Sequence, residues 1–396
     1  MISVSYARTV YGKKEIDAVV KCLKEGTQMG KYAREFEAKI AALFAKKHCL
    51  YVNSGSSALY IGVEAFGFEK GSEVITPALT FSTTVGSIVK AGLIPVFVDV
   101  GVADFCIDPA KIEEMISPKT VAILAPNLIG NICEWDKIAK IAKKYNLRII
   151  EDSADALGST LNGKSSGAWS DMSITSFYGS HIINCAGNGG ALCINDEEHV
   201  KNSKLLRSWG RSSSIFDEKS EAIENRFNVD IDGINYDAKF VFESIGYNLE
   251  GSEIGAAFGL EQLNDLENNI DTRRKNYQTQ INFFKKYEEF FSLPEETKNT
   301  RTGWLAFPII VKDSAPFERR DFQIFLEKRN VQTRVLFTGN ITRQPGFKNI
   351  EMRKAANLDN SDNVMRGGTL LACHHGLNEE MSAHMHSTIS EFLSQY

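Results

Sequence analysis

The sequence predicts an α/β protein, with a large domain built on a mostly parallel β-sheet and a smaller α+β domain after it. Three observations support this prediction. The chain has 396 residues, more than one ordinary domain holds. Short β-branched runs alternate with helical patterns through its first half. A long helical stretch after residue 250 leads into a mixed region. We place the large domain at residues 1–250 and the smaller one at 251–396.

The large domain begins with helical spacing of apolar residues, from which we expect helix through residues 12–47. An apolar run ending in Asn-Ser-Gly-Ser-Ser follows, and the helical pattern ALYIGVEAFGF begins at once. Strand-like runs then occur at 73–78, 95–100, 119–126, 147–153, 173–179 and 191–196, with helical patterns at 83–92 and 134–146. Right-handed crossovers would bring the loops after these strands to one edge of the sheet.

The second half is less regular. Residues 210–245 are polar and predict a surface excursion. A long helical stretch through about residue 290 is expected after YNLEGSEIGAAFGLEQLNDL. The segments WLAFPIIVK and VQTRVLFTGN then mix strand and helix patterns, which favours an α+β unit.

Composition narrows the function classes. The chain is 43% hydrophobic and 24% charged, with a net charge of −5, which argues against a nucleic-acid partner. No apolar run reaches the roughly 18–20 residues of a membrane span. The first residues, MISVSYARTVYGKKEID, lack the apolar core of a signal peptide. We therefore expect no membrane partner.

The cysteines and histidines predict no metal site. Seven cysteines are dispersed without any C-x-x-C spacing, which is typical of reduced thiols in a cytoplasmic protein. Two histidine pairs, His374-His375 and His384/His386, are possible ligands, but neither has a cysteine or acidic cluster beside it. We expect these to be exposed helix and loop histidines.

The stretch NSGSSAL is suited to a phosphate group. Its turn at a helix start offers unpaired backbone amides and the hydroxyls of Ser56 and Ser57, and the helix dipole favours an anion there. A serine N-cap without any ligand would give the same pattern.

Other candidate site residues follow the predicted strands. Asp152 ends a buried strand, where its carboxylate needs a partner such as a protonated pyridine nitrogen; a capping Asp is the alternative. Asp155 would share its face if the chain turns helical there. Phe81 could stack on a cofactor ring or belong to the core. Ser176 and His181 flank a turn before the glycine-rich segment 187–190.

Taken together, these segments resemble the DegT-type sugar-nucleotide aminotransferases, which have the fold type I of pyridoxal phosphate enzymes. The resemblance runs through nearly the whole chain and includes GSSAL, TPALTF, PVFVDV, ED-x-A-x-ALG, the glycine-rich segment and GYNL. It implies that Ser56, Ser57 and Ser176 bind the cofactor phosphate, that Asp152 holds the pyridine nitrogen and that Phe81 stacks on the ring. It also implies that Asn248 reaches the phosphate of a neighbouring subunit's cofactor, so the site would be shared in a homodimer.

One position departs from that family. Its Schiff-base lysine is replaced here by His181, and no lysine occurs between Ser165 and Val200. The same replacement is found in a branch, the nucleotide-sugar 3-dehydratases, which hold pyridoxamine phosphate without a covalent bond. The form NSGSS, Asp155 in ADALG and the segment TRVLFTGNITRQPGFKN at 333–349 also resemble this branch.

Within the branch, one type carries an iron–sulfur cluster on cysteines just after a WGR motif. This sequence has SWGRSSSIFDEKSE there, so no cluster is expected. It resembles instead the cluster-free type that acts on a GDP-linked 4-keto-6-deoxymannose in the colitose pathway, although GYNL is followed by Glu250 where a lysine is more usual. Arg334 and Arg343 are candidate contacts for a diphosphate or sugar, or exposed salt-bridging residues.

The resemblance implies a hydro-lyase that removes the C3 hydroxyl of a nucleotide-linked 4-keto-6-deoxyhexose, with L-glutamate as amino donor and release of ammonia. His181, with an ordinary pKa near 6.5, would move the proton. A sugar aminotransferase that tolerates histidine, an inactive aminotransferase and a regulatory protein that binds pyridoxal phosphate are the alternatives. CDP and dTDP stay open beside GDP.

Overall fold

The computed structural model describes residues 2–215 and 226–396, and part of the predicted surface excursion, residues 216–225, lies outside this range. An eight-stranded sheet in the order β1-β9-β8-β5-β4-β2-β3-β15 forms its centre. All strands run parallel except β9, which is antiparallel to both neighbours. The predicted α/β fold with a mostly parallel sheet is confirmed. The strands are β1 (His48–Val52), β2 (Glu73–Pro77), β3 (Ile94–Val98), β4 (Thr120–Pro126), β5 (Arg148–Asp152), β8 (Met172–Ser176), β9 (Gly190–Ile194) and β15 (Arg353–Lys354).

Helices cover both faces of this sheet, because successive side chains of a strand point to opposite faces. In β4, Ala122 and Leu124 pack in the cluster under α3, whereas Ile123 and Ala125 pack in the cluster under α5. The helices on the first face are α3 (Gly55–Ala65), α4 (Ser82–Lys90) and α6 (Glu197–Arg207). Those on the second are α5 (Trp135–Tyr145), α2 (Lys31–Leu43) and α8 (Glu253–Leu263). Burial on both sides explains why the strands read as continuous apolar runs.

The prediction of helix throughout residues 12–47 is wrong in one respect. The segment forms two helices, α1 (Lys13–Glu25) and α2, separated at Gly26, whose φ of 142° no side chain favours. The buried carboxylate of Glu253 accepts hydrogen bonds from the backbone amides of Gly30, Tyr32 and Ala33, which would otherwise be unpaired at the start of α2. A residue some 220 positions away therefore sets where α2 begins.

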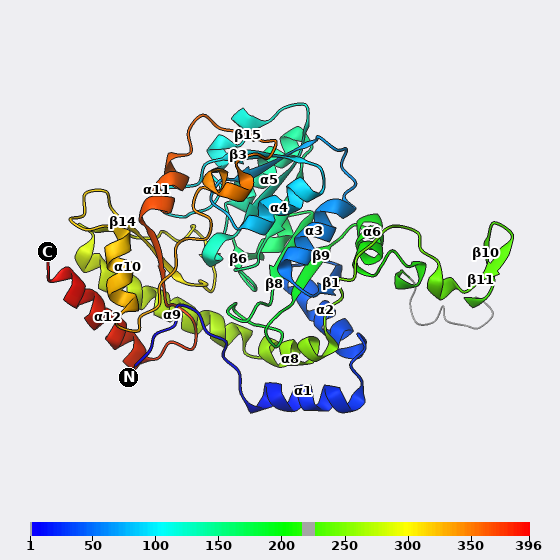
Figure 1. Cartoon of the computed structure of the whole chain (residues 1–396), viewed down its shortest axis with the longest axis horizontal. Helices are drawn as coiled ribbons and strands as arrows, with labels where there is room; N and C mark the ends of the chain where they lie inside the picture. Colours follow the sequence, from blue (N-terminus) through cyan, green and yellow to red (C-terminus); the bar gives the residue numbers. More distant parts are fainter. Residues whose placement is uncertain (1, 216–225) are drawn as a thin grey trace.

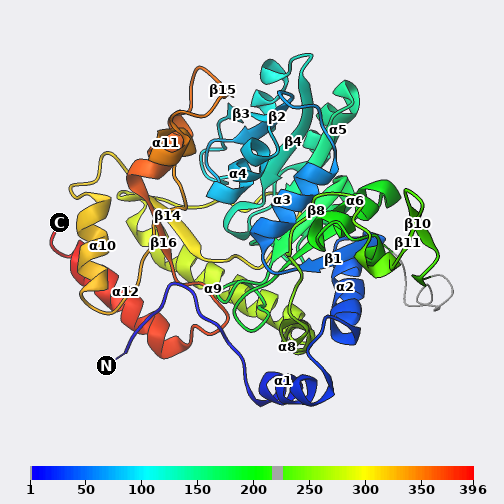
Figure 2. The same cartoon turned by 45° about the vertical axis from the view of Figure 1, so that its right-hand side comes forward.

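The long helix α9 (Leu266–Phe284) connects the large sheet to a second core (Figure 1). There an antiparallel sheet of β12 (Phe291–Ser292), β14 (Phe307–Val311) and β16 (Gly368–Leu371) packs with α10 (Arg319–Glu327) and α12 (Glu379–Leu393), as Figure 2 shows. The helix α11 (Asp359–Gly367) precedes β16, and β15 from the same part of the chain pairs with β3 of the large sheet. The short remaining strands are β6 (Thr160–Leu161), β7 (Lys164–Ser165) and β13 (Thr300–Arg301).

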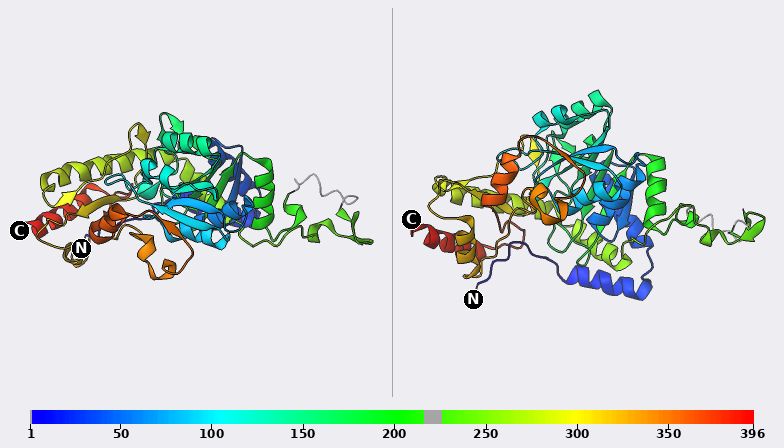
Figure 3. Two further views of the ribbon diagram at one scale, coloured as in Figure 1. Left: turned by 90° about the horizontal axis from the view of Figure 1, so that it is seen from above. Right: turned by 45° about the horizontal axis from the view of Figure 1, so that its top comes forward.

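A hairpin of β10 (Val229–Ile231) and β11 (Ile234–Tyr236) projects from the body of the molecule, as Figure 3 shows. We call residues 226–247 the arm. Its large apolar side chains are exposed, and that of Ile245 is 96% exposed. Such a row of exposed aromatic and aliphatic groups is unusual for a free surface and typical of a contact surface. Within the described residues, no helix has the length and apolar character needed to cross a membrane.

Candidate active site

A cavity of about 310 Å³ lies where β1, β2, β4, β5 and β8 end. Its position agrees with the rule that ligands of open α/β sheets bind beyond the carboxyl ends of the strands. Six of the residues predicted from the sequence line it: Ser56, Phe81, Asp152, Asp155, Ser176 and His181. Four do not, and these are Ser57, Asn248, Arg334 and Arg343.

The start of α3 forms one end of the cavity. Ser54 caps this helix by accepting a hydrogen bond from the amide of Ser57, and Ser56 donates to the hydroxyl of Thr83. Gly55 permits the close approach of β8, because a Cβ on Gly55 would stand 2.7 Å from the Cβ of Ser176. Unpaired amides, the positive end of the helix dipole and two hydroxyls thus meet at this end, as an anion such as phosphate requires.

Ser57 takes part in the cap rather than in the lining. Its hydroxyl donates to Asn53 Oδ1 at 2.6 Å, and the side chain is 7% exposed. Any contact of Ser57 with a ligand at this end would come after a change of rotamer.

Asp152 ends β5 and is 4% exposed. Its carboxylate accepts from the Thr84 hydroxyl at 2.8 Å and from the amide of Ala154 at 3.2 Å. Burial raises the pKa of Asp152 to about 6, against the lowering effect of these donors. A buried carboxylate that has only neutral donors would gain from a cation facing it in the cavity.

Asp155 reaches the cavity through a turn, not through the helix that the sequence suggested. Its Oδ2 accepts from the amide of Ile129 at 3.0 Å. Burial, together with the nearby charge of Asp152, raises the pKa of Asp155 to about 7. Its other oxygen, Oδ1, lies 3.8 Å from His181 Nε2.

His181 presents one ring nitrogen to the cavity. Its Nδ1 lies 3.1 Å from the carbonyl oxygen of Ser176, which can only accept, so Nδ1 carries the proton and Nε2 is the free base. Burial, and then the charge of Arg273, lower the pKa of His181 to about 4, while the Ser176 contact opposes them. The imidazole is thus neutral at pH 7 and a weaker base than its ordinary pKa near 6.5 suggested.

Phe81 and Phe337 form the aromatic part of the lining. Their rings meet edge to face with centroids 5.9 Å apart, and Phe81 is 48% exposed. A ring that is half exposed over a cavity can stack on a planar ligand.

The four predicted residues outside the lining have different surroundings. Arg334 stacks on Tyr6, which does line the cavity, with its guanidinium 4.8 Å from the ring centre. Arg343 is held in an ion pair by Asp362, which raises the pKa of Arg343. Asn248 is exposed at the base of the arm.

Glu250, whose role the sequence left open, accepts from the hydroxyl of Ser208 at 2.7 Å. It therefore ties the strand-like segment after the arm to the end of α6.

Sequence reasoning missed the residues behind His181. Arg273 on α9 is fully buried. The expectation of exposed histidines is wrong, because His374 is fully buried and His375, His384 and His386 are half-buried. His375 accepts from Arg273 Nε at 3.1 Å. Because Arg273 lies in the polar run DTRRKNY of a long helix, no local signal distinguishes it from a solvated arginine.

The donor set fits a pyridine ring that carries a phosphate. Asp152 would face the ring nitrogen, Phe81 the ring, and the start of α3 with Ser176 the phosphate. No lysine is among the described residues that line the cavity. The described residues also contain no group of three or more His, Cys, Asp or Glu side chains that could hold a metal ion.

Comparison with known proteins agrees with this geometry. The profile of the DegT/DnrJ/EryC1/StrS aminotransferase family matches residues 10–390. The chain is 34% identical to the lipopolysaccharide biosynthesis protein RfbH of Salmonella typhimurium, over 97% of this chain and 90% of that protein. It is also 34% identical to dTDP-4-dehydro-2,6-dideoxy-D-glucose 3-dehydratase of Saccharopolyspora spinosa, over 92% of this chain and 81% of that protein.

A solved structure shows the same fold over the whole chain. Escherichia coli GDP-4-keto-6-deoxy-D-mannose-3-dehydratase, with bound hydrated pyridoxal phosphate, superposes with a TM-score of 0.86 at 26% identity and covers 98% of this chain and 100% of that one. The predicted fold type I is confirmed.

Proposed function

We infer the function from the premise that this chain belongs to the DegT/DnrJ/EryC1/StrS aminotransferase family. We propose that it is a 3-dehydratase and not an aminotransferase. Its substrate would be a nucleotide-linked 4-keto-6-deoxyhexose, its cofactor pyridoxal or pyridoxamine phosphate held without a covalent bond, and its amino donor L-glutamate.

One observation carries this proposal. His181 stands in the cavity with a free Nε2, and no lysine is among the described lining residues. Imidazole can exchange protons but cannot form the Schiff base that a transaminase lysine forms. The site therefore keeps a base and lacks a covalent anchor.

The cofactor would be retained by several separate contacts. Asp152 would pair with the pyridine nitrogen, and that pairing compensates a carboxylate that has no cationic partner in the described structure. Ser56, Ser176 and the amides at the start of α3 would hold the phosphate.

The chemistry divides between the cofactor and the side chains. A bound pyridoxamine phosphate supplies an amine that can link to a keto sugar and a ring that accepts electrons. His181 Nε2 would accept a proton and return one to the departing C3 hydroxyl, because the imidazole is neutral at pH 7 and its Nε2 is unprotonated. The Ser176 carbonyl keeps Nδ1 protonated and thus aims Nε2 at the cavity. Ammonia and a 3-deoxy keto sugar would leave.

For the nucleotide we propose GDP, on the similarity to the E. coli enzyme across the whole chain. The dTDP-linked sugar is the second candidate, because the Saccharopolyspora enzyme is 34% identical. We also propose Arg334 as a substrate contact, and its stacking on the cavity residue Tyr6 supports this.

We propose a homodimer whose arms cover each other's sites. The exposed apolar side chains of the arm would be buried in that contact, and Asn248 at its base would reach the partner's phosphate. All seven cysteines are unpaired, which supports a reducing, cytoplasmic compartment.

The alternative is a sugar aminotransferase, which the family name itself favours. The two reactions differ in the fate of nitrogen. We would incubate the protein with pyridoxal phosphate, L-glutamate and, in separate reactions, the GDP-, dTDP- or CDP-linked 4-keto-6-deoxyhexose, then measure ammonia and product mass.

Catalytic ammonia release with a 3-deoxy keto product would support the dehydratase, and the fastest of the three reactions would identify the nucleotide. An amino-sugar product would contradict the proposal in favour of transamination. Loss of both reactions, together with failure of glutamate to convert the cofactor, would indicate an inactive protein.

A further inference from the structure

Arg273 is a buried cation that has no carboxylate partner among its described hydrogen bonds. Its side chain is 0% exposed. Nη1 donates to the carbonyl oxygens of Trp304 and Leu305, both at 3.0 Å. Nη2 donates to the carbonyl oxygen of His181 at 3.3 Å, and Nε to neutral His375. A buried cation among neutral acceptors is less favourable than an apolar group of similar size, so a function for its charge is the natural explanation.

These contacts belong to a closed ring around the cavity floor. Arg273 joins the backbone of His181 to that of Leu305. The amide of Leu305 donates to the carbonyl of Ile129 at 2.8 Å, and the amide of Ile129 donates to Asp155 Oδ2 at 3.0 Å. Asp155 Oδ1 faces His181 Nε2 at 3.8 Å, which closes the ring.

One member of this ring is strained. Ile129 has φ 60° and ψ 12°, a conformation that a β-branched residue adopts only when its surroundings force it. The following Gly130 has φ 94°, and a Cβ there would stand only 3.0 Å from Leu305 N and from Trp304 Cα, so any side chain would strain this turn.

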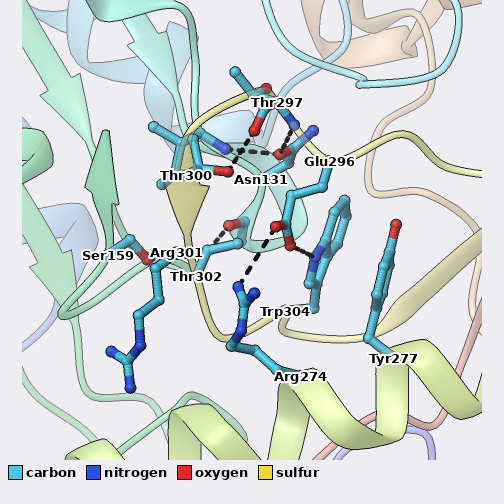
Figure 4. A network of polar contacts seen from close by, with 12 residues as sticks. Asn131, Ser159, Arg274, Tyr277, Glu296, Thr297, Thr300, Arg301, Thr302 and Trp304 are labelled. Carbon is cyan, nitrogen blue, oxygen red and sulfur yellow. Dashed lines mark hydrogen bonds and ion pairs between the residues drawn. The ribbon is translucent and has the colours of Figure 1, made fainter. Parts of the chain in front are cut away.

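Residues 302–305, which pack against this turn, are themselves fixed by hydrogen bonds and ring stacking (Figure 4). Thr302 donates to the carbonyl of Gly130, and Trp304 stacks on Tyr277 with ring centres 4.5 Å apart and donates to Glu296 at 3.0 Å. The strained amide of Ile129 is thereby aimed at Asp155.

We propose that Arg273 is a positioning residue that, through this ring, fixes the imidazole of His181 against Asp155 and, through its charge, keeps that imidazole neutral and ready to accept a proton. This inference rests on the proposed function, in which His181 moves the proton.

The surrounding charges support this role. Three titratable groups approach His181: Asp155 after β5, Tyr178 on the same loop and Arg273 on α9. Asp152 lines the same cavity and its charge raises the pKa of Asp155, and His375 contacts Arg273. The charge of Arg273 lowers the pKa of His181, adding to the larger effect of burial. It also lowers the pKa of Asp155, where it opposes the effect of burial. It therefore favours the same state at both: a neutral imidazole beside a carboxylate.

The test compares Arg273→Gln, which removes the charge, with Arg273→Lys, which keeps the charge but loses the forked contacts. Arg274→Gln is the matched control, because Arg274 is the adjacent residue but is partly exposed and paired with Glu296. In the cofactor-free full chain labelled with ¹⁵N-histidine, the ring signals of His181 would be followed from pH 5 to 8, with His181→Asn for assignment.

We expect His181 to stay neutral over this range in the wild type, in Arg273→Lys and in Arg274→Gln, and to begin to protonate at the acidic end of the range in Arg273→Gln. We expect Arg273→Lys to lower kcat at least tenfold with KM nearly unchanged. A His181 titration that is the same in Arg273→Gln and the wild type would overturn the charge effect. Wild-type kcat in Arg273→Lys would overturn the positioning, including in the case that Arg273→Gln fails to fold.

The two readouts separate this inference from the proposed function. If the wild type dehydrates none of the three nucleotide sugars, the proposed function fails, and kcat is then taken from glutamate-driven conversion of the cofactor. The NMR titration needs neither cofactor nor substrate and still decides the effect of Arg273 on His181.

Discussion

The two ends of the cavity are built on different physical principles. At the α3 end the groups are hydroxyls and backbone amides, and the hydroxyls of Ser54, Ser56 and Ser57 have hydrogen-bond partners within the chain. At the β5 end the buried carboxyl groups of Asp152 and Asp155 lie beside the half-buried His181, and loss of hydration displaces the pKa of each. The hydroxyls of the first end have partners within the chain while the first amides of α3 stay open to an anion, whereas the second end holds two carboxyl groups whose ionisation is opposed by burial. Affinity can therefore come from the first end, and chemistry must come from the second.

The largest difference between the two ends is expected for His181→Asn. Asparagine keeps a polar side chain but cannot exchange a proton, so we expect kcat to fall by about 10²–10⁴-fold. Cofactor affinity, which the comparison assigns to the other end, should change only a few-fold. His48→Asn is the control, since His48 pairs with Glu197 at the surface. A kcat within threefold of wild type would remove His181 from the reaction.

Asp155→Asn tests whether the ionised carboxylate of Asp155 at the β5 end destabilises the folded protein. A carboxyl whose pKa rises to about 7 on folding destabilises the folded state once it ionises, so this penalty is absent below pH 4, grows up to pH 7 and is constant above. Asparagine keeps an oxygen for the Ile129 amide. Without cofactor, its free energy of unfolding at pH 8 should exceed that of wild type by on the order of 2–4 kcal/mol, and by less at pH 5.

Chemical denaturation at both pH values would check this, with the exposed Asp17→Asn as control. A difference from wild type that does not change with pH would contradict the buried ionised carboxylate.

Arg334→Ala and Arg343→Ala extend the comparison to the mouth of the cavity. Arg334 touches the lining residue Tyr6, whereas Arg343 is occupied by Asp362. We expect Arg334→Ala to raise KM for the nucleotide sugar about tenfold, the value of one charge-assisted hydrogen bond. Arg343→Ala should leave KM within twofold. The reverse pattern would transfer the substrate contact to Arg343.

The smallest effect is expected at the α3 end. Ser56→Ala removes one lining hydroxyl and should weaken cofactor binding about three- to tenfold, as the loss of a single hydrogen bond does. Ser57→Ala should leave binding unchanged and cost about 1 kcal/mol of stability, because its hydroxyl donates to Asn53 rather than to a ligand. Fluorescence titration and thermal melts would measure the two quantities. Weaker binding in Ser57→Ala alone would show that its hydroxyl turns toward the ligand.

Much of the fold and several of the cavity residues could be predicted from the sequence, because they depend on local patterns. Alternating strands and helices fix where strands end, and Phe81, Asp152 and Ser176 follow or end such strands. Long-range packing could not be predicted. The break between α1 and α2 depends on Glu253, and Asp155 reaches the cavity through a turn held by Ile129.

The same limit applies to protonation states. The ordinary pKa of His181 is a property of its side chain, whereas the displaced value depends on burial and on Arg273, which lies 92 residues away in the chain. Arg273 itself is indistinguishable in sequence from its neighbour Arg274, which is partly exposed and paired with a carboxylate. Only the packing of α9 against residues 304 and 305 separates the two.

Retention of the cofactor without a covalent bond is tested most directly by borohydride reduction followed by intact-mass measurement. The protein would be incubated with pyridoxal phosphate, reduced, denatured and weighed beside His181→Lys. We predict that wild-type protein keeps its original mass and that His181→Lys gains the mass of one reduced cofactor adduct per chain. An adduct of one cofactor per chain on the wild type would contradict the account, because some other lysine would then anchor the cofactor as in an aminotransferase.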